Sequence, residues 1–297
     1  MSKKVLVIDI GGTNIKYAIM TKDADMLSSS KIPTPDSLEA FLESLYGLVD
    51  TYRQEIEAVA ISVPGKVDTL SRTVYFGGSL TYLDGLNFKT ALGDKYQLPV
   101  AVQNDAKSAA LAELWLGSLK NVKDGAVITL GTGVGGGIVL DGKLRLGSHF
   151  QAGELSMSIL DTDRLGMAKT VGYLGSAVRM ISQVNEAVGE KDLSDGIKAF
   201  ELINKKDQRV YPIFEDYCRS IAYLILNLQA YYDLTTYAIG GGISSQPILI
   251  EEIKHQLQAF IDESPILKLN FPEIAIVKAQ FENDSNLYGA LYQLLQD

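Results

Sequence analysis

A strand, a glycine turn and a second strand occur twice in this sequence, about 120 residues apart. The first copy reads VLVIDI, GGT and IKYAIM over residues 5–20, and the second reads AVITL, GTGVGGG and IVL over residues 126–140. β-Branched and aliphatic runs bounded by glycine clusters are typical of strands joined by tight turns. Because each copy begins one half of the chain, the repeat predicts two similar α/β domains that face each other across a cleft.

Strands and helices alternate along the rest of the chain. The sequence predicts helices at residues 37–53, 106–117, 211–233, 247–261 and 285–296, with helical periodicity in the first and an amphipathic pattern in the last. Apolar runs predict further strands at 58–63, 98–103 and 235–244. The polar stretch 117–125 marks the expected boundary. We therefore expect an N-terminal α/β domain over residues 1–118, with the C-terminal helix 285–297 packing back on it, and a C-terminal α/β domain over residues 119–284.

Charge and cysteine usage exclude several classes of partner. The 297-residue chain has a formal net charge of −9 and one cysteine. An acidic chain has no basic field for a nucleic-acid backbone or an anionic membrane, so any phosphate that it binds should be small and locally held. One cysteine allows no intrachain disulfide and no thiolate zinc cluster. The N-terminus lacks a signal-peptide core and residues 221–232 fall short of a membrane span, so we expect a cytoplasmic protein.

The second glycine turn spells G-x-G-x-x-G at Gly131, Gly133 and Gly136, a pattern shared by unrelated phosphate-binding loops. A dinucleotide fingerprint requires a helix after the glycines, but a strand follows here, so Glu154 is not its ribose-binding acid. A protein kinase would need H-R-D and D-F-G, and a P-loop would need Gly-Lys-Ser/Thr, and none of these occurs. Either both turns bind a phosphate through backbone N–H groups, or both are tight turns without a ligand.

Four motifs together resemble the ROK family of sugar kinases and repressors. They occur in the family's order across the whole chain: Asp9–Thr13 with Lys16, Gly131–Gly137, Ala152–Glu154 and Gly240–Gly242. The resemblance implies an actin-like ATPase (ribonuclease H-like) fold, with two similar α/β domains around a central cleft. It also implies ATP and Mg²⁺ as cofactors and a sugar or glucoside as substrate, and since relatives are commonly dimers, we expect a homodimer.

The resemblance assigns the nucleotide to the glycine turns and the metal ion to Asp9. Asp9 ends the first strand beside the first turn, where its carboxylate would hold Mg²⁺ directly or through water; the structural alternative is an aspartate that simply closes a turn. The predicted nucleotide-binding residues are Asp9, Gly11, Gly12, Thr13, Lys16, Gly131, Thr132, Gly133, Gly135, Gly241 and Gly242.

Asp105 is the predicted general base. It follows a buried strand and opens a helix, whose N-terminus favours the ionised carboxylate by about 0.3–1 kcal/mol, and an ionised carboxylate can accept the proton of a sugar hydroxyl. An N-cap is the ordinary role of such an aspartate, but the match to the family's Asn-Asp pair favours catalysis. The resemblance adds Gly65, Ser79, Asn104 and Glu154 as sugar-binding residues, although many relatives have asparagine in place of Ser79.

The chain departs from the family pattern after Glu154. Most members continue with Gly-His, a zinc-binding cysteine cluster and a final glutamate, whereas here Ser156 and Met157 replace Gly-His, no cysteine follows nearby, and Val171 falls near the final glutamate. We therefore expect no structural zinc, and one histidine, His149, does not make a metal site. Met157 and Val171 remove hydrogen-bonding groups near the anomeric carbon of a bound sugar, as in zinc-lacking members that phosphorylate β-glucosides.

The predicted function is transfer of the γ-phosphate of ATP to O6 of the non-reducing glucose of β-glucosides such as cellobiose. The alternative is a kinase of free glucose or N-acetylmannosamine. A sugar-responsive repressor without catalysis is a more distant alternative, because the family's repressors carry a helix-turn-helix before the core, whereas this core begins at Lys3 or Lys4 and the chain is acidic.

Overall fold

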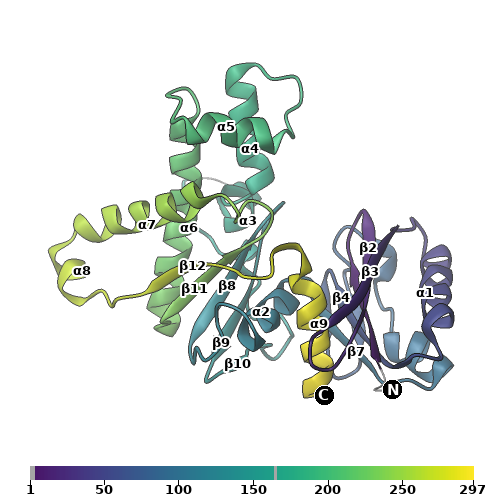
Figure 1. Cartoon of the computed structure of the whole chain (residues 1–297). Helices are drawn as coiled ribbons and strands as arrows, with labels where there is room; N and C mark the ends of the chain where they lie inside the picture. The colour runs from purple at the N-terminus through teal and green to yellow at the C-terminus, as the bar shows by residue number, and fades with distance from the viewer. Residues whose placement is uncertain (1–3, 164–165) are drawn as a thin grey trace. The chain divides into compact units, whose positions relative to one another are not determined.

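The computed structural model describes residues 4–163 and 166–297, which divide into two compact units (Figure 1). Unit 1 contains the chain up to Gly117, together with Leu144–Ala152 and Asp284–Asp297. Unit 2 contains Ser118–Lys143 and Gly153–Asn283. The C-terminal segment therefore belongs to the same unit as the N-terminal strand.

Each unit is built on a five-stranded sheet with the same strand order. In unit 1 the order is β3-β2-β1-β4-β7, and in unit 2 it is β10-β9-β8-β11-β12. In both sheets the first strand pairs antiparallel with the next strand in the chain and parallel with the fourth. The strands are β1 (Lys4–Ile10), β2 (Asn14–Met20), β3 (Met26–Pro33), β4 (Ile56–Val63), β7 (Val100–Asn104), β8 (Gly125–Leu130), β9 (Val134–Leu140), β10 (Lys143–Leu144), β11 (Thr236–Gly240) and β12 (Ala275–Lys278). The common order confirms the predicted duplication of one α/β arrangement.

The sheet of unit 1 lies between two helices: α1 (Leu38–Tyr52) covers one face and α9 (Ser285–Gln296) covers the other (Figure 1). Alternate residues of β1 supply the two faces, as strand geometry requires. Leu6 and Ile8 join a core with buried residues of α1, whereas Val5 and Val7 join a second core with buried residues of α9. The middle of β1 is therefore buried on both sides, which explains the unbroken apolar run Val5–Ile8.

Helix α2 (Asp105–Trp115) packs on α9 with the two backbones in direct contact. A Cβ added at Gly289 of α9 would lie 1.7 Å from the carbonyl oxygen of Ser108 in α2. Further along the same pair, the rings of Trp115 and Tyr292 stack at a centroid distance of 5.0 Å. Only glycine at position 289 permits this approach, which brings the N-terminal halves of the two helices together.

Unit 2 places its long helices against one continuous hydrophobic core. Its helices are α3 (Val171–Leu174), α4 (Ala177–Val188), α5 (Gly196–Asn204), α6 (Tyr211–Tyr232), α7 (Pro247–Asp262) and α8 (Pro265–Asn270). Buried residues of α4, α5, α6 and α7 share this core with alternate residues of β8 and β11. Among the described residues, no helix has the length and apolar character that a membrane crossing requires.

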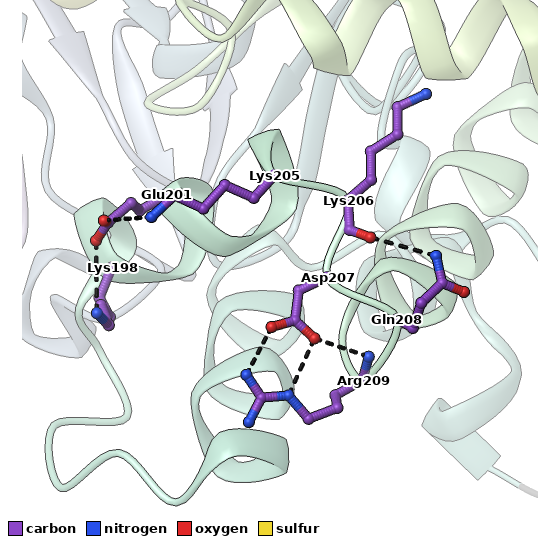
Figure 2. A network of polar contacts seen from close by, with 7 residues as sticks. All are labelled: Lys198, Glu201, Lys205, Lys206, Asp207, Gln208 and Arg209. Carbon is purple, nitrogen blue, oxygen red and sulfur yellow. Dashed lines mark hydrogen bonds and ion pairs between the residues drawn. The ribbon is translucent and has the colours of Figure 1, made fainter.

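Charged side chains form ion pairs and hydrogen bonds at the end of α5 and in the connection to α6 (Figure 2). Arg209 donates to both carboxylate oxygens of Asp207, at 3.0 and 2.6 Å, and its own N–H also donates to that carboxylate. These hydrogen bonds hold the pKa of Asp207 at about 2. On α5, Glu201 pairs with Lys198 and Lys205. Exposed pairs of this kind stabilise little individually, so the group mainly shapes the turn.

The second glycine turn is shorter than its sequence predicts. The turn ends at Gly133, and Gly136 lies within β9, paired with Ile128 of β8. A Cβ added at Gly136 would lie 2.4 Å from Cδ1 of Leu155 and 2.7 Å from the carbonyl oxygen of Val127. Gly136 therefore serves packing: it lets the Leu155 side chain lie directly on the strand. The predicted turn over 131–137 is wrong for its last four residues.

Small elements of unit 1 complete the part of the fold that carries the candidate site. A two-stranded sheet of β5 (Lys66–Asp68) and β6 (Thr73–Tyr75) follows the turn at Pro64 and Gly65. Short helical turns occupy Thr81–Leu83 and Lys89–Asp94 in unit 1 and Leu155–Met157, Gly166–Lys169 and Glu282–Asp284 elsewhere in the chain.

Candidate functional site

Asp9 lies near the end of β1 and is half-buried. Burial raises the pKa of Asp9 to about 6, and although a hydrogen bond from Asn286 lowers this pKa, the negative charge of Asp105 raises it. Nδ2 of Asn286 donates to Oδ1 of Asp9 at 3.0 Å. Asp9 and Asp105 are therefore close enough in unit 1 for their charges to interact. A divalent cation such as Mg²⁺ close to Asp9 would favour the ionised form that burial and the charge of Asp105 disfavour.

The β1–β2 turn is held closed by hydrogen bonds that leave Gly12 at its tip. The N–H of Gly11 donates to the carbonyl of Asn14 at 3.0 Å, and the hydroxyl of Thr34 donates to the carbonyl of Gly11 at 2.6 Å. A Cβ added at Gly12 would lie 2.9 Å from Oγ of Ser79. The structure thus brings Ser79, predicted to bind sugar, against the turn predicted to bind phosphate.

Lys16 extends from β2 on the same side of the turn as the C-terminal segment. Its Nζ lies 3.3 Å from Oδ1 of Asp284, immediately before α9. Position 16 pairs with Asp9 across the β1–β2 ladder. The C-terminal segment thus contributes two side chains, Asp284 and Asn286, to the surroundings of Asp9.

The β8–β9 turn of unit 2 abuts the start of α4. The N–H of Gly131 donates to the carbonyl of Gly133 at 3.0 Å, and the N–H of Ala177, the first residue of α4, donates to the carbonyl of Gly131 at 2.9 Å. Thr132 at the tip is exposed. A helix N-terminus beside a glycine turn favours an anion at that place.

Gly241 follows β11 and packs directly on the end of β8. Its φ is +93°, and an added Cβ would lie 2.2 Å from the carbonyl oxygen of Leu130. Glycine is therefore required at 241, whereas nothing lies within 4 Å of a Cβ added at Gly242. The close approach brings the motif predicted for adenosine next to the turn predicted for phosphate, since Leu130 directly precedes Gly131.

Asn104 caps helix α2, so the ordinary N-cap role considered for Asp105 is wrong. Oδ1 of Asn104 accepts the N–H of Lys107 at 3.1 Å, and Asp105 is the first residue of the helix. Nδ2 of Asn104 donates to Oδ1 of Asp105 at 2.8 Å and to the carbonyl of Gly65 at 2.9 Å. The amide thereby ties the carboxylate to the turn at Gly65. A capping amide can orient a base in this way while the helix N-terminus favours its ionised form.

Gly65 adopts a φ of +98° and packs against the segment that follows β6. A Cβ added there would lie 2.8 Å from the carbonyl oxygen of Tyr75 and 2.9 Å from that of Phe76. Unit 1 therefore gathers Gly65, Asn104 and Asp105 into one contiguous group, and it also holds Asp9 and Ser79.

Glu154 lies in unit 2, at the start of the short helix Leu155–Met157. The next residue but one, Ser156, braces the β8–β9 turn: its Oγ accepts the N–H of Val134 at 2.9 Å and donates to the carbonyl of Val134 at 3.1 Å. The Gly131 to Gly133 hydrogen bond closes the hairpin, so in an antiparallel ladder the two polar groups of Val134 face away from β8. Ser156 satisfies both of them.

Met157 and Val171, the two residues expected near the anomeric carbon of a bound sugar, differ in their exposure to solvent. Met157 is 69% exposed, as an open site requires. Val171 is fully buried in the core of unit 2. Its side chain packs with apolar neighbours, so of the two residues only Met157 presents its side chain at the surface.

Sequence reasoning missed Asn286 and the bracing role of Ser156. The only signal for Asn286 was the prediction that the last helix packs back on the N-terminal domain. For Ser156 the signal was its place in the family motif, where glycine is usual.

No group of three or more His, Cys, Asp or Glu side chains that could hold a metal ion occurs within residues 4–163 and 166–297. Asp9 would therefore bind Mg²⁺ together with phosphate oxygens and water, which is the usual mode for this ion. Three cavities in unit 2, of about 550, 280 and 190 Å³, are lined by other residues than the predicted site residues.

A family model described as ROK family matches residues 5–297. The chain belongs to the ROK family. A β-glucoside kinase from Listeria monocytogenes is 30% identical over 99% of this chain and 98% of its own length, and an N-acetylmannosamine kinase from Haemophilus influenzae is 28% identical over 97% of this chain and 94% of its own.

Two solved structures of the ROK family show what similar chains bind. A ROK protein from Streptococcus pneumoniae in complex with sucrose is 30% identical, with a TM-score of 0.87 over 99% of this chain and 98% of its own. A glucokinase from Streptomyces griseus in complex with glucose and AMPPNP is 26% identical, with a TM-score of 0.81 over 99% of this chain and all of its own. The predicted actin-like ATPase fold, common to ROK sugar kinases, is confirmed.

Proposed function

We propose that this protein is an ATP-dependent sugar kinase that phosphorylates O6 of the non-reducing glucose of β-glucosides such as cellobiose. The observation that carries the kinase assignment is the tethered carboxylate of Asp105, held by Asn104 and Gly65 in the unit that also contains Asp9 and the first glycine turn. Family membership and the glucokinase complex with a nucleotide analogue support the same assignment.

The proposed chemistry is an in-line phosphoryl transfer. The carboxylate of Asp105 accepts the proton of the O6 hydroxyl, O6 bonds to the γ-phosphorus, and the bond from that phosphorus to the β–γ bridging oxygen breaks to release ADP. Mg²⁺, when bound, would neutralise charge on the phosphate oxygens. Asp9 would hold this ion, while the N–H groups of the turns at Gly11–Thr13 and Gly131–Gly133 bind phosphate oxygens and Gly241–Gly242 accommodate adenosine.

The choice of a β-glucoside rests on the surroundings of Glu154. In the proposed complex Glu154 binds sugar hydroxyls, and Met157, which is 69% exposed, leaves room for a glycosidic substituent. Ser79 and Gly65 contact the sugar from unit 1. The similarity to β-glucoside kinases and to a protein that binds sucrose supports this choice.

A kinase of free glucose or N-acetylmannosamine is the alternative, and it is favoured by the glucose-bound relative and by the N-acetylmannosamine kinase. The predicted absence of structural zinc, the homodimer and the cytoplasmic location stay predictions.

A coupled assay of ADP release with cellobiose, glucose and N-acetylmannosamine distinguishes a β-glucoside kinase from a kinase of free sugars. We expect the highest kcat/KM with cellobiose. Rapid turnover of either free sugar with none of cellobiose would replace the β-glucoside assignment by the alternative, and no turnover of any sugar would contradict the kinase itself.

A further inference from the structure

Phe76 combines an exposed aromatic ring with a backbone conformation that such residues rarely adopt. Its φ is +54° and its side chain is 72% exposed. For a bulky residue a positive φ is a genuine outlier. Glycines occupy the next two positions, 77 and 78, yet phenylalanine stands where the chain turns left-handed. Strain of this kind persists where the surroundings enforce it, and it is frequent in ligand-binding segments.

The main chain of Phe76 is held in place on both sides of its Cα. Its N–H donates to Oδ1 of Asp84 at 3.0 Å. Its carbonyl oxygen accepts the N–H of Gly78 and lies 2.9 Å from the position of a Cβ added at Gly65. The backbone is thus fixed by neighbours within unit 1, while the ring gains no burial from the fold.

A cation lies beside this ring. Nζ of Lys66 is 4.6 Å from the ring centroid of Tyr75 and 5.9 Å from that of Phe76. Lys66 pairs with Tyr75 across the β5–β6 ladder, which places the ammonium and the Tyr75 ring on one side of the hairpin, and Phe76 directly follows the end of β6. An apolar ring face beside N–H donors suits a ligand that has both an apolar face and hydroxyl groups.

Close packing and hydrogen bonds join the segment of Phe76 to the proposed base. The carbonyl oxygen of Phe76 packs against Gly65, where an added Cβ would lie 2.9 Å from it. The carbonyl of Gly65 accepts a hydrogen bond from Asn104, which also donates to Asp105. The exposed aromatic residue and the proposed base therefore lie on two segments of unit 1 that are tied together through Gly65.

We propose that Phe76, with Lys66, forms a subsite for the aglycone of the substrate. It takes a ring with an apolar face, either the C–H face of a second pyranose or an aryl group. This inference rests on the proposed β-glucoside kinase activity and names the residues that select its substrates. It also explains why the chain keeps a strained, exposed phenylalanine beside two glycines.

The test compares Phe76→Ala with wild type on four acceptors: cellobiose, phenyl β-glucoside, methyl β-glucoside and glucose. Loss of the stacking face should raise KM about three- to tenfold for the two acceptors with a second ring, and leave kcat and the methyl β-glucoside and glucose values unchanged. The two ring-bearing acceptors distinguish a sugar aglycone from an aryl one. Phe76→Trp should restore KM, and Leu70→Ala, which removes a 78% exposed side chain from the same hairpin, should change nothing.

The thermal midpoint should not fall in Phe76→Ala, because the ring is not part of the core. A rise of KM for a ring-bearing acceptor alone supports the subsite. An unchanged KM for both, or an equal rise for methyl β-glucoside, overturns it while the kinase assignment stands. Failure of wild type to phosphorylate any β-glucoside would instead contradict the proposed function.

Discussion

The carboxylate of Asp105 is oriented by hydrogen bonds from neighbouring residues. The carboxylate accepts hydrogen bonds from the N–H of Ala106 at 2.8 Å and from Nδ2 of Asn104, also at 2.8 Å. Its orientation is therefore set by the local structure of α2 before any ligand binds. A base that is already oriented avoids an ordering cost in the transition state.

Asp105→Asn should retain sugar binding and lose turnover. An amide of the same shape keeps most hydrogen bonds of the site but cannot accept a proton, so kcat should fall by about 10² to 10⁴. Steady-state kinetics gives kcat, and calorimetric titration with cellobiose gives the affinity. A variant that keeps wild-type turnover would remove Asp105 from the role of base.

Ser156→Ala should weaken nucleotide binding more than sugar binding. The change leaves both polar groups of Val134 without their partner beside the β8–β9 turn. We expect KM for ATP to rise about threefold to tenfold, as loss of a hydrogen bond predicts, with a smaller effect on KM for the sugar. Ser158→Ala is the matched control in the same loop. Equal KM values for ATP in wild type and Ser156→Ala would contradict the bracing role.

Residue roles that depend on spacing along the chain were predictable, whereas those that depend on tertiary contacts were not. Asp105 was placed correctly at the start of a helix, because an apolar strand precedes it and a run of small and aliphatic residues follows it. Asn286 comes to Asp9 from 277 positions away. Val171 was expected near a bound sugar from its place after Glu154 in the family pattern, but the fold buries its side chain among apolar neighbours.

The contact of α2 with α9 links the proposed base to Asn286, because Asp105 lies in the first turn of α2 and Asn286 in the first turn of α9. Gly289→Ala should reduce stability by about 2 kcal/mol or more, because overpacking of this size forces the backbones apart. Since a Cβ there would lie 1.7 Å from the carbonyl oxygen of Ser108, the N-terminal ends of both helices should shift and turnover should fall.

Gly47→Ala in α1 is the matched control. Nothing lies within 4 Å of a Cβ added at Gly47, which is exposed, so alanine should stabilise the helix by about 0.5–1 kcal/mol. Thermal unfolding followed by circular dichroism compares both variants with wild type. Wild-type stability in Gly289→Ala would show that the two helices do not need their close contact.

The packing of α6 on α7 should be sensitive to acid through Glu252. Burial alone raises the pKa of Glu252, but hydrogen bonds from Gln256 at 2.7 Å, Tyr211 at 2.8 Å and His255 lower it below its usual range. A lowered pKa in the folded state means that stability from the ionised form is present above the unfolded pKa, about 4.5. This stability is lost as the pH falls through the folded pKa.

Glu252→Gln should therefore be less stable than wild type at neutral pH, by roughly 1–3 kcal/mol, and should lose less stability on acidification. Urea unfolding at pH 7 and at about pH 4 measures both effects. Glu251→Gln, at an exposed neighbouring position, should behave as wild type. Identical pH dependence in wild type and Glu252→Gln would remove Glu252 as the acid-sensitive group.

Elements with strong periodicity were predicted nearly to their ends, as α6 and α9 show. Strand β3 was missed, because MLSSSKIP has little apolar character; it forms an exposed edge by pairing with β2. The glycines of β9 were assigned to a turn, since nothing local reveals that Leu155 packs on them. The local sequence pattern thus predicts an element that buries its own apolar face. It does not predict an element whose conformation depends on contact with a residue far away in the sequence.

For the whole molecule, the strongest prediction from sequence was the duplication. Two hairpins 120 positions apart indicated two similar α/β units, and both sheets have the same strand order. The joining of residues 284–297 to unit 1 places the last helix beside the first strand. A chain with this arrangement can supply Asp9, Asp105 and Asn286 to one unit although they span nearly its entire length.

The central claim is that ATP phosphorylates O6 of the non-reducing glucose, with Asp105 as the base. The most direct test incubates the protein with ATP, Mg²⁺ and cellobiose labelled with ¹³C at C6 of the non-reducing ring, and records ¹³C and ³¹P spectra. We predict a phosphomonoester signal with phosphorus coupling to the labelled carbon, and no such signal with Asp105→Asn. Phosphate on another carbon, or no phosphorylated cellobiose while free glucose is phosphorylated, would contradict the account.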